Sequence, residues 1–251
     1  MKTLTAAKLM ATIGLVVTVA MFSGCIRRTS DPVPEETEFI ADKITLSNAV
    51  GAVNVTGNAN RIIHSRVQVE KRVQTYSLFG LANPDNYLDR VEVYQGVKQG
   101  ELHIAVSVKP LPFLERLFVK VSPRVQFDLA TPVAMTTDVA LDVGDVSINN
   151  LVGEVTAKVD VGEMAVDSTL GIFGSQSYTV NIGSLDMQLP KDMPLRYDLE
   201  TSMGSINHSG FDMDVERRFL GARATGAMGM TVTPSFVKGR VNIGSINFRG
   251  K

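Results

Sequence analysis

The chain has 251 residues, with 25 basic and 26 acidic residues and a formal net charge of −1. This balance excludes the strongly basic surface that a nucleic-acid-binding protein needs. Hydrophobic residues make up 44% of the sequence, but only 6% of the residues are aromatic and tryptophan is absent. Val, Ile and Thr fill short alternating runs along most of the chain, so we expect an all-β protein with a sizeable core.

The first 24 residues predict an export signal. Lys2 and Lys8 precede an apolar run at residues 9–21. A run of about 13 residues is too short to span a bilayer core of roughly 30 Å as a helix. A basic start, a short apolar stretch and small residues before a cut are typical of a signal peptide. We expect cleavage between Gly24 and Cys25.

Cys25 is the only cysteine in the chain. The sequence Ser23-Gly24-Cys25 resembles the lipobox of bacterial lipoproteins, in which the cysteine is acylated and becomes the mature N-terminus. The lipobox prefers Leu where this chain has Phe22, and an ordinary signal peptide with an unrelated cysteine is the alternative. A lone thiol has no disulfide partner, which favours acylation. With Ile26 rather than Asp next, the resemblance implies anchoring in the outer membrane of a Gram-negative cell.

Four segments follow one another along the chain. After the signal peptide, residues 25–38 are polar and contain proline, which predicts a lipidated, disordered tether. Residues 39–132 form a less regular N-terminal β region. Its rhythm breaks at 74–90, where we expect an excursion with a helical turn, and again at the apolar segment 110–118. Residues 133–251 carry a β-strand repeat that continues this region.

The repeat centres on a glycine between apolar residues. The clearest copies are LDVGDVSI, VDVGEMAV, VNIGSLDM, TSMGSINH and VNIGSINF, and the first four glycines are 18, 21 and 21 residues apart. NAVGAVNV is an early copy and GAMGMTV a degraded one. The predicted corner glycines are Gly51, Gly144, Gly162, Gly183, Gly204, Gly229 and Gly244.

The alternation of apolar and polar residues shifts by one at each of these glycines. In a straight strand, residues three apart such as Val143 and Val146 point to opposite faces. Both point into one core only if the chain bends at Gly144, where glycine permits unusual backbone angles. By the same argument we expect Met203 and Ile206 inside. The repeated bend predicts a β-solenoid of stacked 18–21-residue rungs, each bonded to the next in sequence, and a β-sandwich is the alternative.

These residues resemble a known family. The stretches LDVGDVSINNLVGEVTAKVDVGEMAV and LDMQLPKDMPLRYDLETSMGSI are similar to the bacterial DUF4097-type β-strand repeat family, whose members are regarded as candidate adhesins. The resemblance covers most of residues 40–250 and is weakest at 209–236. It implies a β-repeat fold and an adhesin-like role. It brings no catalytic residues to this chain.

Polar residues recur beside the corner glycines. Asp142 and Asp160 lie two residues before a glycine, and Asp145 and Glu163 lie directly after one. Stacked rungs would align them into ladders on the outer surface, where Ca²⁺ could bind to oxygen ligands. The alternative is a solvated face, and we predict neither a cofactor nor a metal. A carbohydrate-active site would instead need Asp142, Asp160 and Asp186 to converge in a cleft.

The sequence therefore favours a non-enzymatic, lipid-anchored cell-envelope protein. Its solenoid would serve as a structural or adhesin-like surface for an envelope protein or a glycan. A carbohydrate-active β-helix enzyme is one alternative. An envelope-stress or assembly accessory is another, which an exposed apolar patch near residues 111–118 would favour.

Overall fold

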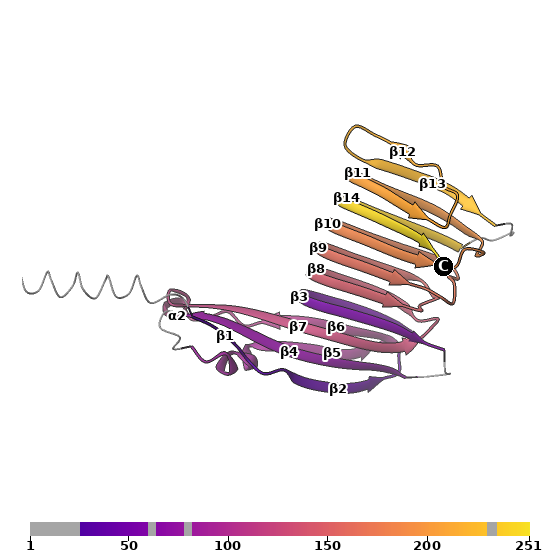
Figure 1. The fold of residues 1–251 in the computed structure, drawn as a ribbon. Coiled ribbons are helices and arrows are strands. Elements are labelled where there is room, and N and C mark those ends of the chain that lie inside the picture. The colour runs from indigo at the N-terminus through magenta and orange to yellow at the C-terminus, as the bar shows by residue number, and fades with distance from the viewer. Residues whose placement is uncertain (1–25, 60–63, 78–81, 230–234) are drawn as a thin grey trace, which may run out of the picture. The chain divides into compact units, whose positions relative to one another are not determined.

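The computed structural model describes residues 26–59, 64–77, 82–229 and 235–251. Within these residues the protein is all-β, with two short helices between long strands (Figure 1). No helix in this part of the chain is long and apolar enough to cross a membrane. The signal peptide and Cys25 lie outside the described residues, so the predictions made for them stay predictions.

The elements, in chain order, are β1 (Ile26–Thr29), β2 (Val33–Phe39), β3 (Lys43–Asn58), β4 (Ser65–Ser77), the 3-10 helix η2 (Pro84–Arg90), β5 (Val91–Lys98), β6 (Glu101–Val108), α2 (Phe113–Arg116), β7 (Val119–Pro132), β8 (Thr136–Asn149), β9 (Val155–Asp167), β10 (Ser175–Leu189), β11 (Leu195–Ser209), β12 (Glu216–Arg217), β13 (Ala222–Met228) and β14 (Ser235–Gly250). They divide into two compact units. Unit 1 comprises Met1–Pro32, Lys71–Glu92 and Val108–Arg124, and unit 2 comprises Val33–Glu70, Val93–Ser107 and Val125–Lys251.

Unit 1 contains both helices and a short strand pair. Strand β1 runs antiparallel to the end of β4, with Ile26 opposite Ser77 and Thr29 opposite Gln74. The Ser30 hydroxyl accepts a hydrogen bond from the backbone N–H of Val73 at 2.9 Å. The predicted tether at residues 25–38 is thus corrected, because β1 and β2 occupy most of it. A polar segment can be ordered when a neighbouring strand satisfies its backbone groups. The helical turn expected within 74–90 is η2.

Unit 2 is organised around six parallel strands that carry the repeat. Their order is β3-β8-β9-β10-β14-β11, with β13 and β12 continuing beyond β11. Strand β3 therefore joins the repeat strands, as its early copy of the glycine-centred repeat, NAVGAVNV, predicts. The expectation that each rung bonds to the next in sequence is wrong at one place. Strand β14 lies between β10 and β11, parallel to both, and β11 pairs antiparallel with β13 on its other side.

Short connections force these strands to bend. Strand β9 starts beside the beginning of β8, with Val155 opposite Thr137. A straight strand of 14 residues would be about 46 Å long. The chain from Asn149 to Val155 spans six steps and reaches at most about 20 Å. The two ends of β8 must therefore be much closer together than in a straight strand, and the bend brings them there.

Burial shows where the bend lies. In β8, Leu141 and Val146 are both at most 2% exposed although they are five residues apart. The residues between them are exposed or partly exposed. They occupy the convex side of the bend, so both arms turn their apolar side chains to one core. The bend explains why the alternation of apolar and polar residues shifts by one at the glycine. The expectation that Val143 and Met203 point into the core is wrong, because these side chains are 46% and 47% exposed.

Six glycines stack in register at the bend. Their φ angles lie between +134° and +150°, a region that L-residues rarely adopt. A Cβ atom on any of them would lie 1.6–1.8 Å from a backbone carbonyl oxygen of the neighbouring strand. These are Gly51, Gly144, Gly162, Gly183, Gly244 and Gly204, in spatial order. Gly229 is not among them: it follows β13 and lies against Pro194, so its assignment as a corner glycine is corrected.

We predict that Gly183→Ala strongly destabilises the protein. Its Cβ would lie 1.7 Å from the carbonyl oxygen of Gly162, in the middle of the stack. Gly174→Ala is the matched control, because Gly174 also has a positive φ (+103°) but no atom within 4 Å of the added Cβ. Backbone strain alone costs about 1–3 kcal/mol, and we expect the loss at Gly183 to exceed about 4 kcal/mol. Urea unfolding measures both, and equal losses would contradict the stacking argument.

Candidate functional site

The bent strands of unit 2 present rows of polar side chains that bond to one another across strands. Two residues before the corner glycine, the Asn181 amide donates to Asp160 at 2.6 Å and the Asn242 amide donates to Asn181 at 2.9 Å. Three residues after the glycine, the Asn247 amide donates to Asp186 at 2.7 Å, and Asn207 donates to Asn247 at 2.9 Å. Each amide thus links two strands, and the rows are continuous.

The acidic residues predicted beside the corner do not converge. Asp160 accepts a hydrogen bond from Asn181 and also pairs with Lys158 at 2.9 Å. The hydrogen bond between Lys158 and Asp160 raises the pKa of Lys158. Asp145 accepts a hydrogen bond from the backbone N–H of Glu163 at 3.2 Å. Asp142 and Asp160 lie before the corner glycine whereas Asp186 lies after it. Among the described residues no three metal-ligating side chains come together.

An apolar row runs along the outside of the same corner. It consists of the residues directly before the glycines, which pair in register from strand to strand. These are Val143, Val161, Ile182, Ile243 and Met203, each 44–48% exposed. At a strand spacing of about 4.8 Å the row is about 20 Å long. We call it the corner row. Sequence reasoning found these residues but placed them in the core.

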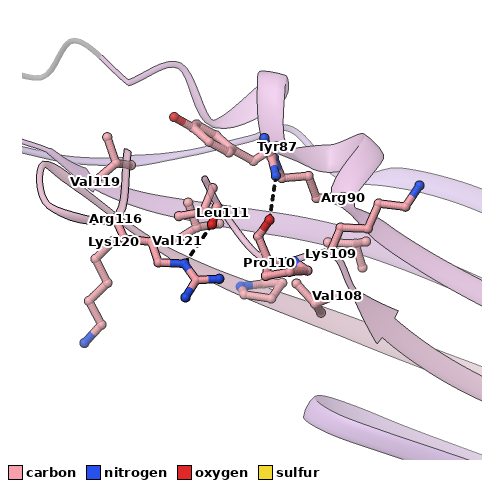
Figure 2. A pocket seen from close by; sticks show the side chains of 12 residues that line it. Tyr87, Arg90, Val108, Lys109, Pro110, Leu111, Arg116, Val119, Lys120 and Val121 are labelled. Carbon is pink, nitrogen blue, oxygen red and sulfur yellow. Dashed lines mark hydrogen bonds between the residues drawn. The ribbon is translucent and has the colours of Figure 1, made fainter. Parts of the chain in front are cut away.

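Unit 1 contains a separate cavity of about 490 Å³ between η2, α2 and the first residues of β7. Its walls are mostly apolar and include Val91, as well as Leu111, Val119 and Val121, which are labelled in Figure 2. Two arginines hold the segment before α2 in place. Arg90 donates to the carbonyl oxygen of Pro110 at 3.0 Å, and Arg116 donates to that of Leu111 at 2.7 Å.

A buried tyrosine supports one wall of this cavity. The Tyr87 hydroxyl donates to the Glu115 carboxylate at 2.6 Å, and the Arg90 guanidinium lies 3.7 Å from the same carboxylate and 6.0 Å from the centre of the Tyr87 ring. Burial, reinforced by the hydrogen bond to Glu115, raises the pKa of Tyr87 to about 12. The three side chains thus join η2 to α2.

The cavity is lined by four cations, and none of its lining residues is acidic. Arg90 is balanced by Glu115, and Lys109 by Glu92 at 2.5 Å. Arg116 and Lys120 form no ion pair with any residue that the structure describes. An apolar wall beside such cations suits an amphipathic anion. Sequence reasoning noted residues 110–118 as an apolar excursion but did not identify this site, because it forms only where residues 87–91 fold against residues 108–123.

One solved structure shares this fold, and a second gives a weaker superposition. The crystal structure of a candidate cell adhesion protein from Clostridium sporogenes superposes with a TM-score of 0.55 at 16% identity, over 88% of this chain and 100% of that one. A candidate adhesin from Bacteroides fragilis gives a TM-score of 0.30 at 13% identity, over 86% and 97%. No protein-family model and no curated protein matches the chain. The first likeness shows a shared fold, and membership of the DUF4097-type family stays a prediction.

We predict that Tyr87→Phe weakens the dependence of stability on alkaline pH. The Tyr87 pKa rises from 10.0 to about 12 on folding, so the folded chain keeps a proton that the unfolded chain releases. The contribution of the raised Tyr87 pKa to the free energy of unfolding is complete below pH 10 and is lost as the pH rises towards 12. At about 1.4 kcal/mol per pH unit it amounts to at most roughly 3 kcal/mol, because solvent screens the partly buried hydroxyl. Urea unfolding of both proteins across this range measures it, and parallel losses would contradict the prediction.

Proposed function

We propose that this is a non-enzymatic, lipid-anchored protein of the cell envelope, and that unit 2 is a β-solenoid that presents a binding surface to another envelope molecule. The bend in each repeat strand and the short return connections support the solenoid. The Clostridium sporogenes structure is that of a candidate cell adhesion protein, which agrees with this role. The resemblance of Ser23-Gly24-Cys25 to a lipobox supports a lipid anchor on Cys25. Ile26 directly after the cysteine favours anchoring in the outer membrane.

The corner row is the observation that carries this proposal. A contiguous exposed apolar surface marks an interaction site more often than scattered apolar residues do. The row combines aliphatic side chains with a methionine, a residue type enriched in protein interfaces. Polar residues flank it at a regular spacing and can fix the register of a partner. We therefore favour a protein over a glycan as the molecule bound by unit 2.

The arrangement of the carboxylates supports a binding role over carbohydrate cleavage. Glycosidases place two carboxyl groups on either side of the bond that they cleave. Here Asp160 is held by Asn181 and Lys158, and Asp186 by Asn247 at 2.7 Å with Arg249 3.7 Å away. Both carboxylates serve as acceptors within the rows, on opposite sides of the corner glycine.

A photo-crosslinking residue placed at Ile182 should trap a partner in the native envelope. Ile182 lies in the middle of the corner row and is 48% exposed, so a bound partner would cover it. The same residue placed at Thr156, which is exposed on β9 away from the row, is the control. We expect a discrete product from Ile182 alone, which Val161→Ser in the same chain should reduce several-fold. Crosslinks to no protein, or equally from both positions, would contradict the proposal.

Cys25→Ser should release the protein from the membrane fraction. The substitution removes the only thiol, and with it the acylation that the lipobox resemblance implies. Fractionation of cells that express each protein measures the effect, and mass spectrometry of the wild-type N-terminal peptide detects the acyl groups directly. Membrane retention of the variant at the wild-type level would contradict the anchor.

A further inference from the structure

Unit 1 exposes a compact group of large apolar side chains around α2. Phe113, Leu114, Leu117 and Phe118 are 60–75% exposed. Leu117 follows Phe113 by four residues, and Phe118 follows Leu114 by four residues. One helical turn therefore places the members of each pair on the same side. We call these four residues the apolar tip. Four adjacent large side chains at such exposure are unusual on a soluble surface and indicate that the tip is covered in the cell.

The apolar tip lies close to the start of the mature chain. Arg27 on β1 pairs with Tyr76 on β4, and Tyr76 lines a surface hollow together with Leu117 and Phe118. Figure 1 shows α2 and β1 at the same end of unit 1. Cys25 directly precedes Ile26, the first residue of β1. Acyl chains on Cys25 would therefore be attached one residue before the strand that lies at this end of unit 1.

The positive charge around the tip favours an anionic lipid surface. Between residues 108 and 124, four basic residues stand against one acidic residue, whereas the whole chain has a net charge of −1. The acidic residue, Glu115, is already engaged by Tyr87 and Arg90. The basic residues include Arg116 and Lys120, which are exposed and flank the tip. Cations beside exposed apolar and aromatic side chains suit an anionic lipid headgroup region.

We propose that the apolar tip inserts into the phospholipid bilayer in which the chain is anchored, with Arg116 and Lys120 against anionic headgroups. This inference rests on the proposed lipid anchor. The bilayer is favoured over a protein partner because acylation of Cys25 would hold the tip at the membrane surface in every molecule. The tip then acts as a second attachment beside the acyl chains and fixes how unit 1 meets the bilayer.

A single tryptophan can report the insertion, because the chain has none of its own. We would purify the full chain, as exported and processed by the cell, with Phe118→Trp. It would be bound to vesicles of phosphatidylethanolamine and phosphatidylglycerol. Insertion should shift the emission to shorter wavelength, and lipids brominated on their acyl chains should quench it. Phe219→Trp in unit 2 is the matched control, because Phe219 is 100% exposed.

We expect several-fold stronger quenching in F118W than in F219W. Adding Leu114→Ser and Leu117→Ser should abolish the difference while the circular dichroism spectrum stays unchanged, since both side chains are exposed. Equal quenching in the two reporters would overturn the inference. A blue shift of F118W without bromine quenching would also overturn it, because a protein then covers the tip.

Mass spectrometry of the same samples separates this inference from the anchor. Quenching of F118W in a chain that carries no acyl group supports insertion and contradicts only the anchor. An acylated, vesicle-bound chain whose F118W reporter is not quenched contradicts only the insertion. Vesicles of phosphatidylcholine alone should weaken the binding of the unacylated chain, because its cations then lose their anionic partners.

Discussion

The structure of unit 2 depends on the direct approach of one glycine to the next at the bend. Each of the six stacked glycines lies where a Cβ would meet a neighbouring carbonyl oxygen at under 2 Å. A strand that bends beside another therefore needs glycine at that position, even where the neighbour carries a different residue, as Val125 of β7 does beside Gly51. This requirement also fixes the register, because a shift of one residue would bring a side chain to the bend and reverse the buried face.

The same constraint permits β14 to lie between β10 and β11. Its Gly244 stacks on Gly183 on one side and carries Gly204 on the other. The flanking residues match as well, since Asn242 bonds to Asn181 and Asn247 to both Asp186 and Asn207. A strand with the glycine-centred repeat fits at any position in the stack. The order of strands is thus set by the positions that the connections allow, rather than by the repeat itself.

This distinction marks what the sequence could predict. The glycine phrase and the shift in alternation indicate the bend and most of the core, such as Leu141 and Val146. They do not indicate the position of β14, because a repeated phrase makes several neighbours equivalent. They also misplace Val143, because apolar character alone predicts burial, whereas the convex side of a bend leaves four consecutive residues outside the core. The cavity beside Tyr87 was not predictable, since its residues are brought together only by folding.

The two exposed apolar surfaces differ in the charge beside them, and this difference favours a different partner for each in the two proposals. The apolar tip of unit 1 is flanked by Arg116 and Lys120. The position directly before the corner row of unit 2 holds no cation; it is occupied by Asp142, Asp160, Asn181, Ser202 and Asn242. An anionic membrane would attract the first surface, whereas the second offers its headgroups no positive charge. If the chain is anchored as proposed, the corner row is therefore better suited to a partner outside the bilayer than to the bilayer itself.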